Sequence, residues 1–287
     1  MVSAAQCPPT TEGSPLVVRD VSKSFRAADG SVVLAITGVS LTVSPGELVS
    51  VIGPSGCGKS TLLRLIAGLD TPTSGELRIH GELITEPSAE RGLMFQDHNL
   101  FPWLTVRGNI ESGLVARGVL RQRRHEVDEF MRLVGLEAFA SLYPHQLSGG
   151  MAQRAALARA LVNHPKVMLL DEPLGALDQF TRMRLQDEVL HLWRARRPTM
   201  VLVTHDIDEA IYMSDRIHIM SPRPGRIERV IEVSLERPRL RTSAPFMELR
   251  SSILKMLHLS GKEDNRSLRA DTETNGVADA RRTDRDP

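Results

Sequence analysis

Residues 53–60 read Gly53-Pro54-Ser55-Gly56-Cys57-Gly58-Lys59-Ser60 and match the pattern G-x-x-x-x-G-K-[ST] in full. The apolar run Leu48–Ile52 precedes this stretch, and a helical pattern follows it as far as Ala67, with Gly68 as its C-cap. In that context the glycines let backbone N–H groups turn inward around an anion, and the helix start adds its positive end. A chance glycine-rich turn is the alternative, and the flanking strand and helix count against it. The stretch predicts a phosphate-binding loop.

The loop side chains suggest how a nucleotide and its metal ion are held. Lys59 is placed to reach the β- and γ-phosphates, and the Ser60 hydroxyl to hold Mg²⁺. Cys57 lies near a helix start, where a thiol can become reactive, but a variable loop position is the simpler interpretation. The nucleotide is predicted to contact the whole loop and the residue that follows it, namely Gly53, Pro54, Ser55, Gly56, Cys57, Gly58, Lys59, Ser60 and Thr61.

Two further apolar runs end in side chains suited to phosphate chemistry. Val167–Leu170 is followed by Asp171 and Glu172, and a second run, Thr199–Val203, is followed closely by His205. Ligands in α/β folds bind at the carboxyl ends of parallel strands. We therefore predict that Asp171 organises Mg²⁺, that Glu172 polarises the attacking water as general base, and that His205 contacts the γ-phosphate. The alternatives are acids at the N-terminus of a helix and a structural histidine.

Short apolar strands alternate with helical patterns through most of the chain, which predicts an α/β fold with a parallel sheet covered on both faces. Arg216–Met220 is a fourth apolar run. The start of the chain differs, because β-rich runs separated by turn residues suggest antiparallel strands there. These runs are Val17–Val18, Val32–Ile36 and Val39–Val43, and the helical patterns are His125–Val134, Met151–Val162 and Arg182–Arg194.

The chain divides into four regions by composition. Residues 1–15 are small, polar and proline-rich and are predicted to form a disordered lead, whereas 16–235 carry the patterning of a folded domain. Residues 236–260 are predicted to be a helical extension that contains an amphipathic helix over Pro245–Leu259. Residues 261–287 are dense in charge and nearly free of large apolar side chains, which predicts a disordered tail.

Bulk composition narrows the classes of function. The 287 residues are 41% hydrophobic and carry a formal net charge of +1, which gives no sign of a nucleic-acid-binding surface. The two cysteines, Cys7 and Cys57, lie far apart in no metal-ligand spacing, which suits a reducing cytosol. No apolar run approaches the roughly 18–20 residues that span a bilayer, and the N-terminus does not resemble a signal peptide. Any membrane role is therefore expected to depend on partners.

A second candidate anion site lies at Leu147-Ser148-Gly149-Gly150-Met151, where a helical pattern begins. Ser148 is a suitable N-cap, and the two glycines leave backbone N–H groups uncovered for an anion. Taken alone, this string indicates no more than an ordinary capped helix. Beside a phosphate-binding loop in the same chain, it suggests a second phosphate-binding element.

These motifs together resemble the ABC transporter ATPase family, in which such a signature accompanies a Walker A loop, a Walker B strand and a histidine switch. Gln96 matches the glutamine loop of that family, and Leu174–Asp178 matches its D-loop. Phe25 stands where the family places an adenine-stacking aromatic, although tyrosine is commoner there. The resemblance covers about residues 16–232. It implies a P-loop NTPase fold with a RecA-like parallel-sheet core, an N-terminal antiparallel β subdomain and a helical signature subdomain.

The resemblance also implies a mechanism and partners. Two copies would pair head to tail, with ATP and Mg²⁺ held between the glycine-rich loop of one copy and Ser148, Gly149 and Gly150 of the other. Gln96 would contact the metal, take part in catalysis and couple closure to the membrane. The implied partners are a second copy, two transmembrane permease subunits and an external solute-binding protein that acts through them, with no nucleic acid. The implied location is the cytoplasmic face of the cell (inner) membrane, as a peripheral protein.

Several strings resemble the branch that imports nitrate, sulfonates and taurine, and they favour aliphatic sulfonates, then taurine, then nitrate. They are Phe101-Pro102-Trp103, Tyr143-Pro144-His145, Gly175–Thr181 and Met220–Gly225. Trp103 is predicted to form part of a groove for the permease, the alternative being that it packs in the core.

An importer of another small solute and an exporter remain alternatives. Kinases and GTPases have no use for the signature, ribosome-acting relatives carry two cassettes, and DNA-repair relatives carry a long coiled-coil insertion that this chain has no room for.

Overall fold

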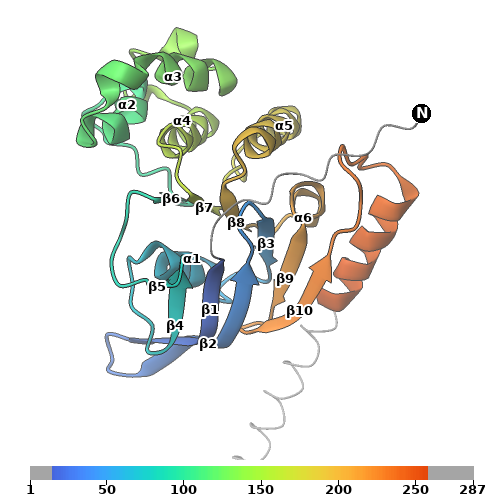
Figure 1. Cartoon of the computed structure of the whole chain (residues 1–287). Coiled ribbons are helices and arrows are strands. Elements are labelled where there is room, and N and C mark those ends of the chain that lie inside the picture. The colour runs from blue at the N-terminus through green and yellow to red at the C-terminus, as the bar shows by residue number, and fades with distance from the viewer. Residues whose placement is uncertain (1–14, 258–287) are drawn as a thin grey trace, which may run out of the picture.

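A six-stranded sheet forms the centre of the computed structural model, which describes residues 15–257 (Figure 1). Its strand order is β10-β9-β3-β8-β7-β6, in which β10 is antiparallel to its neighbour and the other strands are parallel. The sequence-based prediction of an α/β fold with a parallel core is confirmed. The strands are β3 (Leu48–Ile52), β6 (Arg91–Met94), β7 (Val167–Asp171), β8 (Thr199–Val203), β9 (Arg216–Met220) and β10 (Ile227–Glu232).

A second, antiparallel sheet has the order β2-β1-β4-β5. The two β-rich runs predicted at 32–36 and 39–43 are one long strand, because Gly38, at φ 57°, takes up an irregularity in the pairing with β1 without ending the strand. The strands are β1 (Leu16–Arg26), β2 (Val32–Val43), β4 (Ser74–Ile79) and β5 (Glu82–Leu83).

Most helices begin at a side chain that accepts a backbone N–H. Ser148 accepts from Met151, Asp178 accepts from Thr181, and Asp206 caps a short helix in the same way. Gly68 closes the first helix at φ 79°, as predicted. The helices are α1 (Lys59–Ala67), α2 (Val106–Ala116), α3 (Leu120–Leu133), α4 (Gly149–Leu161), α5 (Gln179–Arg196) and α6 (Ile207–Met213), with 3₁₀ turns at Glu137–Phe139 and Pro144–Gln146.

Side chains alternate along the central strands, so that the sheet buries both faces. In β8, Met200 and Leu202 join one apolar cluster, whereas Val201 and Val203 join the other. The first cluster includes side chains of α4, α5 and α6, and the second those of α1 and the antiparallel sheet. Helices α2, α3 and α4 pack together as a separate group, hereafter the helical subdomain (Figure 1).

A further helix spans 244–257 and packs on the core through the buried side chains of Phe246 and Ile253. It confirms the amphipathic helix predicted from Pro245, apart from its last two residues, which lie outside the described part. The two regions predicted to be disordered also lie outside the described part, except for Pro15. They are residues 1–15 and 261–287. The predicted domain limits remain predictions. Within residues 15–257 no helix has both the length and the apolar character that crossing a membrane requires.

Arg239 ties the segment before this last helix to the core. Its side chain is 5% exposed, and its guanidinium donates hydrogen bonds to the carbonyls of Ser214 (2.6 Å) and Val233 (3.0 Å), among others. Burial lowers the pKa of the Arg239 guanidinium to about 10. The group nevertheless stays charged at neutral pH and satisfies carbonyls at the end of α6.

We expect Arg239→Ala to lower the free energy of unfolding by about 3 kcal/mol, because it leaves several buried carbonyls without a donor. Urea unfolding followed by circular dichroism measures the loss. Arg229→Ala, on the exposed surface of β10, is the matched control and should change stability by less than about 0.5 kcal/mol. Equal stability of the two variants would contradict this role of Arg239.

Candidate functional site

A cleft of about 460 Å³ lies where β3, β6 and β7 end. Parallel strands that end together bring residues from distant parts of the sequence to one edge of the sheet. The cleft thereby unites most of the predicted nucleotide-binding residues with two predicted catalytic ones. Its lining is Phe25, Val33, Ala35, Ser55, Gly56, Gly58, Lys59, Ser60, Thr61, Gln96, Glu172 and Arg223.

The glycine-rich loop is held tightly against the antiparallel sheet. Gly58 has φ 99°, and a Cβ there would come within 2.3 Å of the Ile36 Cγ2 atom, so this position requires glycine. Lys59 Nζ donates to the backbone carbonyls of Gly53 (2.8 Å) and Pro54 (2.9 Å). The ammonium group is therefore held over the loop, where it can exchange these carbonyls for phosphate oxygens.

Asp171 and Ser60 form a suitable oxygen donor set for a hard cation. Asp171 is buried at the end of β7, and its Oδ1 atom has no hydrogen-bond partner among the described residues. Burial raises the pKa of this carboxyl, although a hydrogen bond with Ser60 and the charge of Lys59 act in the opposite direction. A buried carboxylate oxygen without a partner, beside a hydroxyl, suits Mg²⁺.

The carboxylate of Glu172 lies between two other predicted catalytic side chains. Its Oε2 atom is 3.2 Å from His205 Nδ1 and 3.5 Å from Gln96 Nε2. Glu172 adopts the left-handed backbone conformation at φ 47°, immediately after the end of β7. Non-glycine residues rarely adopt this conformation, and it persists only where the surrounding structure holds it. The three residues that we predicted separately are thus brought together.

The signature motif does not line this cleft. Ser148 caps α4 by accepting from the Met151 N–H at 3.3 Å, as predicted, and both Ser148 and Gly149 are exposed. A Cβ added to Gly149 would meet no atom within 4 Å. The two predicted phosphate-binding elements therefore stand apart in one chain, and each is open to an outside ligand.

Cys57 is buried, and burial raises the pKa of its thiol, although the charge of Lys59 acts in the opposite direction. This disfavours the thiolate that a redox role requires.

Phe25 borders the cleft with 42% of its surface exposed, as an adenine-stacking ring requires. Trp103 is 69% exposed, and its ring centroid lies 5.4 Å from that of Phe101. The alternative that Trp103 packs in the core is wrong.

Sequence reasoning missed Gln153, which connects the signature helix to the catalytic strand. This side chain is 3% exposed, donates to the Glu172 carbonyl at 3.0 Å and accepts from the Ala176 N–H at 3.0 Å. The one available signal was a polar residue on the otherwise apolar, core-facing side of the helix. Gln153 therefore positions the backbone that carries Glu172.

We expect Gln153→Ala to lower the kcat of ATP hydrolysis about 10- to 100-fold, because misplacing a catalytic group by about 1 Å has an effect of this size. KM for ATP should change little, since the glycine-rich loop is untouched. Steady-state ATPase assays measure both constants, with Gln122→Ala on the exposed face of α3 as the control. A raised KM with normal kcat would contradict the positioning role.

A glycine-rich loop between β3 and α1, with a carboxylate at the end of β7, a parallel strand of the same sheet, defines a P-loop nucleotide-hydrolysing fold. The family model described as "ABC transporter" matches residues 36–175. The aliphatic sulfonates import ATP-binding protein SsuB of Bacillus thuringiensis subsp. konkukian is 48% identical over 244 residues, which are 85% of this chain and 96% of that protein. An uncharacterized ABC transporter ATP-binding protein of Methanocaldococcus jannaschii is 47% identical over 243 residues, 84% of this chain and 91% of that protein.

Among solved structures, the ATP-binding cassette MJ0796, determined as a dimer in a post-hydrolysis state bound to ADP and Pi, superposes with a TM-score of 0.70. It is 35% identical, and the match covers 77% of this chain and all of that one. The chain belongs to the ABC transporter family, as an ATP-binding subunit that hydrolyses ATP.

Proposed function

We propose that this chain provides the energy for an importer of aliphatic sulfonates by hydrolysing MgATP. The observation that carries the choice of solute is the 48% identity to an aliphatic sulfonate import subunit, which extends over 96% of that protein. The Phe101-Pro102-Trp103 string and the others that resemble the sulfonate, taurine and nitrate branch support the same choice. Taurine and nitrate remain the next solutes to test.

In the proposed reaction, the Glu172 carboxylate accepts a proton from water as the water oxygen bonds to the γ-phosphorus. The bond from that phosphorus to the β–γ bridging oxygen breaks, which leaves ADP and inorganic phosphate. Ser60 and Asp171, with Gln96 nearby, would hold Mg²⁺, which would neutralise phosphate charge. His205 contacts the γ-phosphate and holds Glu172, which its 3.2 Å separation from that carboxylate supports. Phe25 stacks on the adenine.

The proposed working unit is a pair of these chains beneath two permease subunits, on the cytoplasmic face of the membrane. The exposed signature at Ser148–Gly150, apart from the chain's own cleft, supports pairing in which each copy completes the other's site. The exposed ring of Trp103 supports docking of a permease segment near it. An external solute-binding protein would choose the solute and act through the permease.

Growth of a strain that lacks the gene tests the proposed solute. With an alkanesulfonate as sole sulfur source, we expect failure that the wild-type gene rescues and Lys59→Ala does not. Cultures on sulfate, on taurine and with nitrate as nitrogen source run in parallel. Uptake of a radiolabelled alkanesulfonate, in a strain from which other sulfonate importers are also deleted, gives the direct readout. Normal uptake by the deletion strain would overturn the sulfonate proposal, and failure on taurine or nitrate instead would redirect it.

A further inference from the structure

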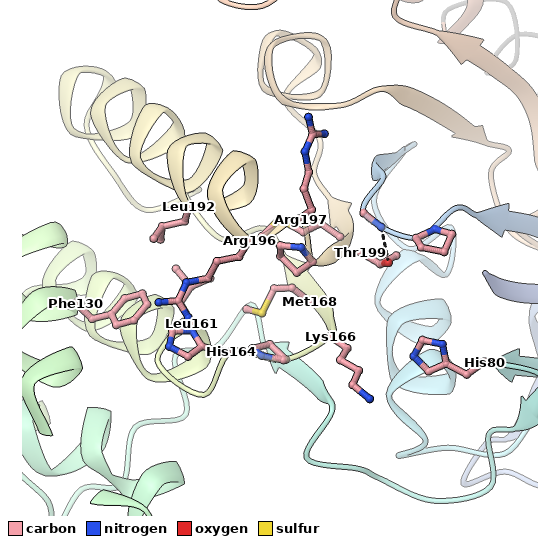
Figure 2. Close-up of a pocket in the computed structure, with 15 residues that line it drawn as sticks. His80, Phe130, Leu161, His164, Lys166, Met168, Leu192, Arg196, Arg197 and Thr199 are labelled. Carbon is pink, nitrogen blue, oxygen red and sulfur yellow. Dashed lines mark hydrogen bonds between the residues drawn. The ribbon is translucent and has the colours of Figure 1, made fainter. Parts of the chain in front are cut away.

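A second pocket, of about 380 Å³, lies at the edge of the central sheet opposite the nucleotide cleft (Figure 2). Lys166 and Thr199 border it where β7 and β8 begin, whereas the nucleotide cleft lies where β7 ends. Leu161 and Arg196, at the last residues of α4 and α5, form its other side. Its volume is within the range of small-molecule sites, which are about 300–1,000 Å³. Nothing in the proposed ATPase mechanism uses it.

The floor of this pocket is apolar. Its side chains come from α3, α4 and α5 of the helical layer and from strands β7 and β8 of the sheet. Together they form a hydrophobic surface that suits a short aliphatic chain. They are Phe130, Leu161, Met168, Leu192 and Met200.

Basic side chains surround this floor, and most of them already have a partner. Lys166 Nζ pairs with Glu90 at 2.6 Å, and His164 pairs with Glu126. The Arg197 guanidinium lies over the Trp193 ring at 4.3 Å from its centroid. Figure 2 shows the Arg197 side chain pointing away from the labelled floor residues.

Arg196 is the exception. Its guanidinium makes no hydrogen bond or ion pair with any of residues 15–257. Its side chain extends toward Phe130 and His164 (Figure 2). Burial lowers the pKa of the His164 imidazole, and the positive charge of Arg196 lowers it further. A guanidinium without an ion pair, next to an apolar floor, is poised to pair with an oxyanion.

We propose that this pocket binds an amphipathic anion, with a short aliphatic chain on the apolar floor and a sulfonate or carboxylate head on Arg196. Each head carries at least two oxygens, which can accept from two N–H groups of one guanidinium. The pocket joins the helical subdomain, through Phe130 and Leu161, to the central sheet, through Met168 and Met200. An occupant therefore contacts the helical subdomain and the central sheet at once. The inference rests on this geometry and is independent of the solute that the transporter carries.

Calorimetric titration of the full-length chain with hexanesulfonate tests the proposal. Saturating MgADP fills the nucleotide cleft, so that the anion cannot bind at the glycine-rich loop. We expect saturable binding with a dissociation constant below about 10 mM. The Arg196→Gln variant should bind about tenfold more weakly, or worse. Arg194→Gln is the matched control, because Arg194 shares the last turn of α5 and lies outside the pocket lining. It should bind as the wild type does.

Related ligands and one further variant separate the two parts of the site. Hexanoate tests a carboxylate head, whereas hexanesulfonate tests a sulfonate head. Binding of either compound supports the proposal. Hexylammonium and inorganic sulfate should bind at least tenfold more weakly, because they lack the anionic head and the aliphatic chain respectively. Leu192→Gln should weaken hexanesulfonate without affecting sulfate. Absence of binding, equal affinity of Arg196→Gln, or sulfate binding as tightly as hexanesulfonate would each overturn the site.

Discussion

Glu172→Gln slows ATP hydrolysis by about 10²–10⁴ and leaves ATP binding intact, if Glu172 is the general base. Glutamine has the same shape and keeps an acceptor oxygen for His205 and Gln96, but it cannot take a proton from water at neutral pH. The variant therefore keeps neighbours in place of the 3.2 and 3.5 Å contacts of the Glu172 carboxylate. It loses the proton transfer from water. The loss should appear in kcat.

Single-turnover hydrolysis of ATP measures the chemical step directly, and binding of a fluorescent ATP analogue measures affinity. Because ATP is not consumed, the variant should also accumulate as a dimer in the presence of MgATP, visible by light scattering. Glu129→Gln makes the same chemical change on the exposed face of α3 and is the control. Unchanged turnover in Glu172→Gln would remove Glu172 from the role of base.

The sequence predicted the parts of the site that lie within continuous motifs. The glycine-rich loop follows strand β3, which is buried throughout, and such strands show as nearly continuous apolar runs. Glu172 and His205 were each found at the end of such a run. That they meet near 3.2 Å follows from parallel pairing of β7 and β8, which places strand ends at one edge.

Contacts made across the fold were beyond such reasoning. Gln153 reaches the Glu172 carbonyl over 19 residues, and Arg239 reaches Ser214 over 25. Neither contact belongs to a local motif, because each depends on how separate elements pack. The short strand β6 was also missed. Of its four residues only Met94 is buried, and the sequence there shows no apolar run. It nevertheless leads to Gln96, which the motif order alone located.

A comparably large effect is expected from disabling either of the two phosphate-binding elements. Lys59→Ala and Ser148→Arg should each reduce ATPase activity by at least about 10²-fold. The first removes charge stabilisation from the transferring phosphoryl group, and the second fills the anion site at the start of α4 with a bulky side chain. Both variants should stay folded, since the Ser148 side chain is exposed and Lys59 contacts only loop carbonyls and the Cys57 sulfur. Circular dichroism and thermal melting of each variant check this.

Mixing the variants distinguishes sites shared between two copies from sites within one. If each site combines Lys59 of one copy with Ser148 of the other, an equimolar mixture of the single variants recovers up to about a quarter of wild-type activity. This follows because half of randomly formed dimers are mixed, and each mixed dimer holds one intact site. An equimolar mixture of wild type with the double variant should also give about a quarter, from wild-type pairs alone. If each chain formed its site alone, the first mixture would stay inactive and the second would keep about half.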